Sequence, residues 1–285
     1  MTQLAETRTT GSFGILVDVV ASGNVLILSG AGLSTESGIP DYRGPTGLAR
    51  RVTPMTYQTF TGSAAARRRY WARSHLGWRR IARATPNRGH HAVAELGRRG
   101  LLAGIITQNV DGLHHAAGAA EVTELHGSLH RVICLRCGQR TSRTDLDRRL
   151  SAANPGWDGE SAALINPDGD AVLADDATDS FQVVDCPGCQ GVLKPDVVFF
   201  GENVPPQRTQ ACYAAVERAS SLVVLGSSLT VMSGLRYVRH AARLRRPVVI
   251  VNQGSTRGDG HATAILDAQL GQTLGTLVAS LGERG

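Results

Sequence analysis

Four cysteines form two Cys-x-x-Cys pairs, Cys134 with Cys137 and Cys186 with Cys189, separated by a long insert. A Cys-x-x-Cys turn directs two thiolates to one point, and a second turn completes the tetrahedron that Zn²⁺ prefers. Two disulfides or two redox pairs are the alternatives, but no apolar export signal is seen near Met1, which favours zinc. Four protein ligands leave no open coordination position, so we expect a structural zinc and must seek the chemistry elsewhere.

Polar or glycine-rich segments follow four short apolar runs, at 25–28, 102–106, 221–225 and 247–251. These segments are Gly30-Ala31-Gly32 with Ser34, Gln108-Asn109-Val110-Asp111, Gly226-Ser227-Ser228 and Asn252-Gln253-Gly254. Glycines let backbone amides approach a phosphate, and amide or carboxylate side chains can hold a carboxamide and ribose hydroxyls. A lone Gly-x-Gly is weak evidence. The acidic residue that a dehydrogenase carries about 20 residues further on is missing, which disfavours that class of enzyme.

Two further segments carry candidate site residues. The loop Gly38-Ile39-Pro40-Asp41-Tyr42-Arg43 is long and polar, and it offers an acid, a ring and a cation together, so we expect it to line a pocket rather than solvent. His126 follows Glu124-Leu125 and precedes a glycine. Its unperturbed pKa near neutrality suits a general base. Taken alone it is more often a structural histidine, and the neighbouring motifs favour the catalytic interpretation.

The four apolar runs alternate with helical patterns such as 90–99 and 207–219, which predicts an α/β fold built on a parallel sheet. Ligands of such sheets lie beyond the carboxyl ends of the strands, so the polar segments should converge. We expect a discontinuous Rossmann-like domain over 13–44, 87–130 and 192–285. A helical insertion at 45–86 and a zinc-binding insertion at 131–191 should form a smaller domain.

Composition narrows the class of protein. The 285 residues carry a net charge of +6, and Lys194 is the only lysine, so arginine supplies nearly all of the positive charge. Clusters such as Arg67-Arg68-Arg69 are more often solvated helix faces than nucleic-acid sites, and we expect no specific nucleic-acid binding. No apolar run approaches the roughly 20 residues of a membrane helix. We expect a cytoplasmic protein without membrane contact, in which Cys212 is a buried thiol.

The chain resembles the sirtuins, the NAD-dependent protein lysine deacylases, over most of its length, about residues 25–277, and the shared motifs occur in the same order. The resemblance runs through Gly-Ala-Gly-x-Ser, Gly-Ile-Pro-Asp-Tyr-Arg, Thr-Gln-Asn-Val-Asp, Leu-His-Gly, the cysteine pairs, Lys-Pro-Asp-Val-Val-Phe-Phe-Gly-Glu, Gly-Ser-Ser-Leu and Val-Asn. Tyr42, the segment 69–73 and the long insert between the cysteine pairs make it most similar to the class II branch.

This resemblance implies NAD as cofactor and acylated-lysine proteins as substrates. The pyrophosphate would be held by Gly30, Ala31, Gly32, Ser227 and Ser228. The adenosine would be held by Asn252, Gln253, Gly254 and Leu270. The nicotinamide and its ribose would be held by Ile39, Asp41, Asn109 and Asp111. Tyr42 and Arg43 would lie on a loop that covers the reactive sugar carbon. The substrate peptide would meet Phe199, Phe200, Gly201 and Glu202 by β-addition. An apolar tunnel for the lysine side chain would be walled in part by Val198 and Phe200.

The implied reaction begins when the acyl-lysine oxygen attacks the sugar carbon that nicotinamide leaves. His126 then removes a proton from a ribose hydroxyl, and the products are nicotinamide, free lysine and O-acyl-ADP-ribose. A protein mono-ADP-ribosyltransferase with the same NAD site is the main alternative. A zinc-ribbon nucleic-acid module is a second, since Arg131, Arg136 and Arg140 flank the first cysteine pair.

Tyr70 and Arg73 stand three residues apart on one face of an expected helix. Sirtuins that remove acidic acyl groups resemble this chain in having a Tyr-x-x-Arg pair at the base of the tunnel, where phenol and guanidinium bind a carboxylate. The pair could select acidic acyl chains here. Alternatively, Tyr70 is a core residue, Arg73 is structural, and the enzyme prefers acetyl or longer neutral chains.

Overall fold

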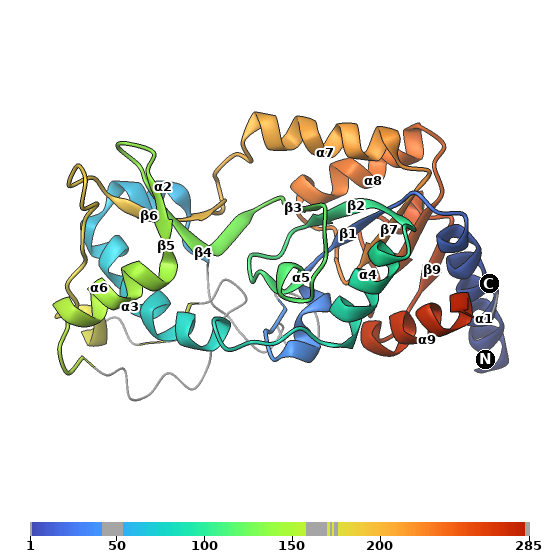
Figure 1. Cartoon of the computed structure of the whole chain (residues 1–285), viewed down its shortest axis with the longest axis horizontal. Helices are drawn as coiled ribbons and strands as arrows, with labels where there is room; N and C mark the ends of the chain where they lie inside the picture. The colour runs from blue at the N-terminus through green and yellow to red at the C-terminus, as the bar shows by residue number, and fades with distance from the viewer. Residues whose placement is uncertain (1, 42–53, 158–169, 172, 174–175, 283–285) are drawn as a thin grey trace.

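The computed structural model describes residues 2–41, 54–157, 170–171, 173 and 176–282, with the side chains of 2–11 left aside. Its larger part is a six-stranded parallel sheet in the order β3-β2-β1-β7-β8-β9 (Figure 1). The inner strands are β2 (Leu102–Thr107), β1 (Val25–Ser29), β7 (Ser221–Leu225) and β8 (Val248–Val251), and the edges are β3 (Val122–Glu124) and β9 (Ala264–Leu266). The predicted parallel α/β fold is confirmed.

Helices cover both faces of this sheet because its strands alternate their apolar side chains between two cores. Ile27 of β1 packs in one core with helices α1 (Thr2–Ala21), α4 (Arg88–Arg98) and α9 (Leu270–Gly282). Leu26 and Leu28 pack in the other with α7 (Pro206–Arg218) and α8 (Met232–Arg243). Figure 1 shows these as two layers, with α7 and α8 above the sheet and α4 and α9 below it.

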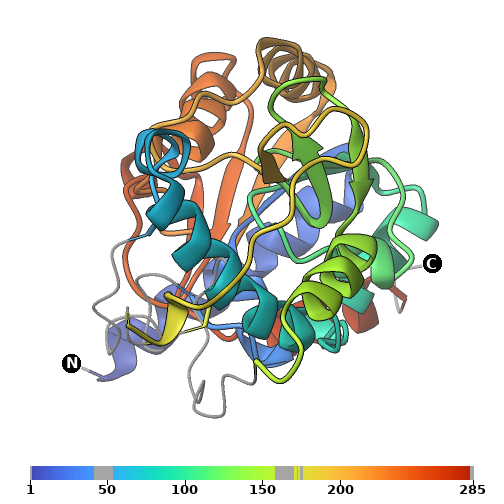
Figure 2. The same cartoon turned by 90° about the vertical axis from the view of Figure 1, so that its left-hand side faces the viewer.

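A smaller module lies beyond the sheet, at the left of Figure 1 and facing the viewer in Figure 2. Its three-stranded antiparallel sheet has the order β5 (Arg140–Ser142), β4 (Gly127–Cys134), β6 (Leu193–Val197). Helices α2 (Tyr57–Gly62), α3 (Ala64–Ile81) and α6 (Arg143–Ala153) complete it. The two insertions therefore pack together, and the sheet of the module includes residues 127–134 and 193–197, while the domain boundaries stay a prediction.

A buried arginine organises the module's core. Arg143 is 1% exposed, and its guanidinium carbon lies 5.5 Å from the ring of Trp71 and 5.3 Å from that of Trp78. It donates to the carbonyl of Ser74 at 3.1 Å and lies 3.4 Å from the carboxylate of Asp147. Aromatic faces and a carboxylate together offset the cost of removing this charge from water.

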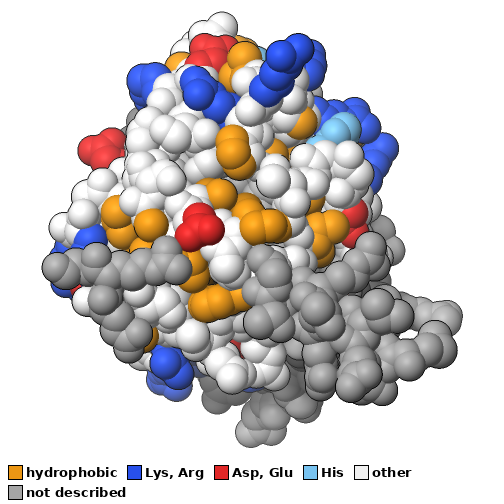
Figure 3. All heavy atoms as spheres, turned by 90° about the vertical axis from the view of Figure 1, so that its right-hand side faces the viewer, with side chains coloured by type: hydrophobic (Ala, Val, Ile, Leu, Met, Phe, Trp, Pro, Cys, Tyr) orange, Lys and Arg blue, Asp and Glu red, His pale blue; other side chains and the backbone are white. Residues whose placement is uncertain are grey.

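The surface shows how the arginines are distributed. On the face in Figure 3, basic side chains lie mainly along the upper edge of the view, with scattered hydrophobic side chains between uncharged ones. Because Lys194 is only 3% exposed, the visible basic groups are arginines. No described helix is long and apolar enough to cross a membrane. The absence of specific nucleic-acid binding stays a prediction.

Candidate NAD and acyl-lysine site

A cavity of about 760 Å³ opens where the carboxyl ends of the parallel strands meet the smaller module. All four polar strand-end segments contribute residues to its wall, as the sheet topology requires. Of the predicted site residues, the following line it: Gly30, Ala31, Gly32, Ser34, Ile39, Pro40, Asp41, Tyr70, Gln108, Asn109, Val110, Asp111, His126, Val198, Phe199, Phe200, Gly201, Glu202, Gly226, Ser227, Ser228, Asn252, Gln253 and Leu270.

Four other predicted residues of these segments are not among the lining residues that the structure describes. Gly38 and Gly254 belong to the same loops but are not among the described lining residues. Gly38 has φ of +80° and ends a short 3-10 turn at 35–37, a backbone conformation that favours glycine. Tyr42 and Arg43 lie outside the described residues.

The two glycine-rich loops, after β1 and after β7, pack backbone against backbone. A Cβ atom on Gly32 would lie 2.9 Å from the Cα of Gly226, and one on Gly226 would lie 2.6 Å from the backbone nitrogen of Leu33. The amide of Gly32 donates to the carbonyl of Gly226 at 2.9 Å. These glycines are therefore required for loop contact as well as for the approach of a ligand.

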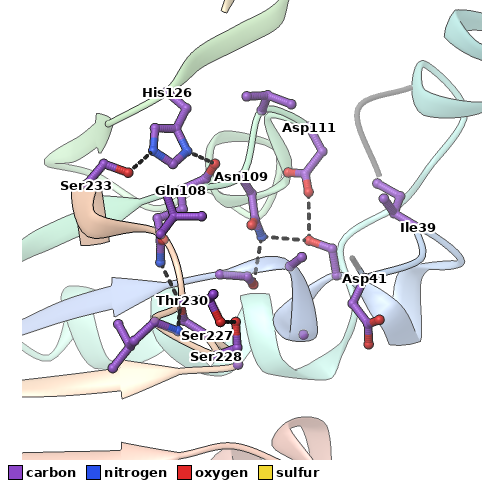
Figure 4. Close-up of a pocket in the computed structure, with 18 of the residues that line it drawn as sticks. Ile39, Asp41, Gln108, Asn109, Asp111, His126, Ser227, Ser228, Thr230 and Ser233 are labelled. Carbon is purple, nitrogen blue, oxygen red and sulfur yellow. Dashed lines mark hydrogen bonds between the residues drawn. The ribbon is translucent and has the colours of Figure 1, made fainter. Parts of the chain in front are cut away.

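A buried hydrogen-bond network fixes the polar wall beside Gly30 (Figure 4). The amide nitrogen of Asn109 donates to the carbonyl of Gly30 and to the hydroxyl of Ser34, both at 3.0 Å. Ser34 donates to the carboxylate of Asp111 at 2.7 Å, and the backbone of Leu113 donates to its other oxygen at 2.9 Å. Burial raises the pKa of Asp111, and these two donors oppose the rise. The network holds an amide and a carboxylate in fixed positions at the cavity wall.

His126 is held at both ring nitrogens. Its Nδ1 lies 3.0 Å from the carbonyl oxygen of Gln108, and its Nε2 lies 2.8 Å from the hydroxyl of Ser233 (Figure 4). A carbonyl only accepts, so Nδ1 carries the proton and Nε2 of the neutral ring is the acceptor. Burial lowers the pKa of His126, against the opposing effect of the Gln108 carbonyl. The ring is thus neutral near pH 7, with a basic nitrogen at the cavity.

Gln108 connects several parts of the wall. Its backbone carbonyl binds His126, and its side-chain nitrogen donates to the hydroxyl of Ser227 at 2.8 Å. The first turn of α8 approaches it closely, since a Cβ on Gly234 would lie 2.6 Å from its side-chain oxygen. One residue after β2 therefore joins the histidine, the loop after β7 and helix α8.

The predicted peptide-binding segment, 198–202, is folded around the only lysine. Lys194 donates to the carbonyls of Val197 and Pro195, at 2.5 and 3.2 Å, and to the carboxylate of Glu202 at 3.0 Å. Glu202 in turn accepts from the backbone of Phe199 at 2.9 Å. Burial lowers the pKa of Lys194, and the charge of Glu202 opposes this shift.

The same segment is tied to the catalytic candidate through the backbone. The amide of Val198 donates to the carbonyl of His126 at 2.8 Å. Phe199 is 8% exposed and packs edge-on against Tyr70, whereas Phe200 is 39% exposed. The segment therefore presents an exposed aromatic side chain beside a buried one.

Of the predicted pair Tyr70 and Arg73, only Tyr70 is among the described residues that line the cavity. Tyr70 is 2% exposed and lines the cavity within an aromatic cluster that includes Phe60, Trp71 and Phe199. Arg73 donates to the carbonyl of Leu173 at 2.9 Å and is not among the described lining residues. This arrangement gives Arg73 a role in holding the insert, while a role in acyl selection stays a prediction.

Asn252, which lines the cavity, directly follows β8. Its side-chain nitrogen donates to the carbonyls of Gln253 and Gly254, both at 2.9 Å, and so shapes its own turn. Glu36, which the sequence did not single out, lines the cavity and accepts from the backbone of Gly271 at 2.9 Å. This bond joins the loop after β1 to the start of α9, next to Leu270.

Ser233 is a further lining residue that the sequence did not single out. It lies in the first turn of α8, five positions beyond Ser228, where a serine is ordinarily interpreted as a helix cap. No pattern along the chain connects it with His126, because the two are 107 positions apart.

The four cysteines of the two pairs converge in the smaller module. Their sulfur atoms all lie within 4.8 Å of one another, with Cys134 to Cys189 at 3.5 Å and Cys137 to Cys186 at 3.8 Å. Sulfur atoms about 2.3 Å from a tetrahedral zinc are roughly 3.8 Å apart, so the donor set fits one Zn²⁺. None of the cysteines forms a disulfide. Cys212 is 1% exposed, which confirms it as a buried thiol.

Comparison with known proteins gives a consistent result. The model of the Sir2 family matches residues 30–233. "NAD-dependent protein deacetylase 1" of Streptomyces coelicolor is 61% identical over 269 residues, covering 94% of this chain and 90% of the relative. A protein of the same name from Mycobacterium avium is 50% identical, covering 93% of this chain and 94% of the relative.

Solved structures agree with these sequence relatives. A Sir2 complex with a p53 peptide and NAD⁺ superimposes with a TM-score of 0.75 at 30% identity, covering 94% of this chain and 98% of that one. Sir2Tm bound to a propionylated peptide gives a TM-score of 0.73 at 28% identity, with the same coverage of both chains. The likeness therefore extends over both parts of the fold.

Proposed function

Because this chain belongs to the Sir2 family, we propose that it is an NAD-dependent protein lysine deacetylase. One observation carries the proposal most directly. The acceptor nitrogen of His126 lies in the wall of the same cavity as the glycine-rich loops and the Asn109–Asp111 network. A base, a pyrophosphate cradle and a polar carboxamide pocket are the parts that this reaction needs.

The cavity walls supply the parts of an NAD site. Gly30, Ala31, Gly32, Ser227 and Ser228 would bind the pyrophosphate through backbone amides and hydroxyls. Asn109, Asp111, Ile39 and Asp41 would hold the nicotinamide and its ribose. Asn252, Gln253, Gly254 and Leu270 would hold the adenosine. Bound there, NAD would supply a sugar carbon that becomes electrophilic as nicotinamide departs.

His126 would act as the general base. Its Nε2 can accept a proton from a ribose hydroxyl while Nδ1 stays bonded to Gln108, so the ring keeps its orientation as it gains charge. The sugar oxygen would then attack the acyl carbon. Low exposure of the ring favours the neutral, basic form before the reaction.

The substrate would enter along the segment 198–202. An extended peptide could add to this segment through backbone hydrogen bonds, beside the exposed side chain of Phe200. The cavity that the lysine side chain would enter is lined by Val198, Phe199 and Phe200. The aromatic cluster around Tyr70 would leave the inner end of the tunnel apolar. That environment suits a neutral acyl group such as acetyl.

The two other conclusions concern architecture and location. We infer a discontinuous Rossmann-like domain with a smaller domain formed by the insertions, in which the four cysteines could hold one zinc. The four cysteines would leave no open coordination position on the metal, so its role would be structural. A cytoplasmic location and the class II branch stay predictions.

The proposal is tested by incubating the protein with NAD and an acetyl-lysine peptide and weighing every product. A deacetylase yields free lysine peptide, nicotinamide and O-acetyl-ADP-ribose in equal amounts. A gain of one ADP-ribose mass on a protein, without deacetylated peptide, would instead establish the mono-ADP-ribosyltransferase alternative. The same assay with His126→Ala excludes a contaminating enzyme.

A further inference from the structure

The hydroxyl of Ser233 lies 2.8 Å from Nε2 of His126, on the side of the ring opposite the Gln108 carbonyl. Because Nδ1 donates to that carbonyl, the neutral ring can only accept at Nε2, so the serine is the donor. Ser233 thus contacts the one nitrogen that the proposed mechanism uses as the base.

The approach of Ser233 is built into the fold. It belongs to the first turn of α8, directly after the loop that carries Ser227 and Ser228. Gly234 permits this turn to pack against the side chain of Gln108, and the Gln108 side chain in turn binds Ser227. Gln108 therefore supplies one hydrogen-bond partner of the His126 ring, its own carbonyl, and packs against the helical turn that carries the other, Ser233.

We propose that Ser233 is a positioning residue for His126, holding the imidazole plane and its acceptor nitrogen toward the cavity until a ribose hydroxyl takes the serine's place. This inference rests on the proposed function. The hydrogen bond at Nδ1 restrains rotation of the ring about Cβ–Cγ, and the second bond at Nε2 restrains it further. The serine hydroxyl can rotate, so it can release Nε2 when the sugar arrives and accept from Nε2 once the ring is protonated.

The role should be visible in only one step of the reaction. In the proposed sequence, nicotinamide leaves before His126 acts. A loss of ring orientation therefore slows the later proton transfer and leaves the earlier exchange of nicotinamide unaffected. A general disturbance of α8 would instead weaken NAD binding and slow both steps, because α8 follows the pyrophosphate loop.

The test compares wild type, Ser233→Ala and Ser233→Thr in steady-state deacetylation and in the exchange of labelled nicotinamide into NAD. For Ser233→Ala we expect kcat of deacetylation to fall about five- to tenfold, the scale of one lost hydrogen bond. The KM for NAD and the exchange rate should stay within about twofold of wild type. Ser233→Thr keeps the hydroxyl and should restore most of kcat.

A double variant completes the test. On a His126→Ala background, Ser233→Ala should have no further effect on deacetylation, because there is no ring left to orient. Equal losses in exchange and deacetylation, an additive double variant, or an unchanged or raised kcat in Ser233→Ala would each overturn the positioning role. Failure of the proposed function would look different, since wild type itself would then produce no deacetylated peptide.

Discussion

The ammonium of Lys194 and the carboxylate of Glu202, 3.0 Å apart, close the segment between them into a compact turn. The lysine also binds the carbonyls of Pro195 and Val197, and the glutamate binds the amide of Phe199. The side chain of Lys194 is 3% exposed and that of Glu202 is 24% exposed. A largely buried ion pair therefore shapes the surface on which the peptide is proposed to bind. In a protein proposed to act on lysine, its own only lysine is buried and structural.

Replacing Lys194 by Met should deform the peptide-binding segment without removing a cofactor contact. We expect the KM for an acetyl-lysine peptide to rise about tenfold, on the scale of a lost charged hydrogen bond, while the affinity for NAD changes little. Part of the loss arises because Glu202 is left as a partly buried charge. Lys194→Met combined with Glu202→Gln should therefore bind peptide better than Lys194→Met alone. An unaltered peptide KM in the single variant would contradict this view.

Cys137→Ser should release the metal and lower the thermal stability. A structural zinc contributes directly to the folding free energy, and three sulfur ligands with one hydroxyl bind it more weakly. Metal analysis and thermal unfolding provide the measurements, with Cys212→Ser as the control for metal content because Cys212 lies outside the four-cysteine cluster. Retention of one zinc at wild-type stability in Cys137→Ser would show that the four sulfurs are not its ligands.

His126→Ala should reduce deacetylation about 10²-fold or more, the usual effect of removing a general base, while NAD affinity changes far less. The pH profile adds a second check. The pKa of His126 is below its ordinary value, so the base is unprotonated at neutral pH and activity should stay level there. Activity should fall only at pH values clearly below 6.5. A loss of NAD binding equal to the loss of rate would make His126 a structural residue.

His90 and His114 should make the protein sensitive to acid. Their rings are 5.2 Å apart, and burial lowers the pKa of His90 to about 4 and that of His114 to about 3. Among the described residues, Nε2 of His90 and Nδ1 of His114 have no hydrogen-bond partner. The unfolded chain, with ordinary histidine pKa values near 6.5, binds more protons, so stability is complete above that pH and declines as pH falls toward 4.

His114→Leu should flatten this decline by roughly 2 kcal/mol between pH 7.5 and pH 5, because the variant has one buried base fewer to protonate. Urea unfolding at several pH values measures the slope. His261→Gln is the matched control, since His261 is exposed and should leave the slope unchanged. Zinc release in acid contributes equally to the pH dependence of stability in the variants and in wild type, so the comparison between them removes this contribution. A wild-type slope in His114→Leu would contradict the prediction.

Acyl choice depends on whether Arg73 reaches the substrate. Its bond to the carbonyl of Leu173 and the apolar surroundings of Tyr70 favour acetyl over succinyl or glutaryl peptides. We therefore expect wild type to be at least about tenfold more active on acetyl-lysine, and Arg73→Met to affect all acyl groups alike through stability. Selective loss of acidic substrates in Arg73→Met would restore the acidic-acyl hypothesis.

Much of this protein could be predicted from local pattern. Buried parallel strands are continuous apolar runs, so 25–28, 102–106, 221–225 and 247–251 predicted the inner strands of the sheet. The edge strands β3 and β9 have three residues each, too few for a pattern to be recognised. Helix α8 begins without a side-chain cap, so the sequence did not mark its first residue. The cysteine pairs were readable because metal ligation imposes a fixed spacing.

The contacts that orient the site were decided only by the tertiary structure. The residue types at 108–111 and His126 indicate chemistry, and the chain order places them at one edge of the sheet. Nothing local indicates that Ser233 contacts His126, that Glu36 binds the start of α9, or that Arg73 turns to Leu173. Each of these bonds joins segments far apart in sequence. Which residues become partners depends on how helices and loops pack on the sheet, and a local sequence pattern does not determine that packing.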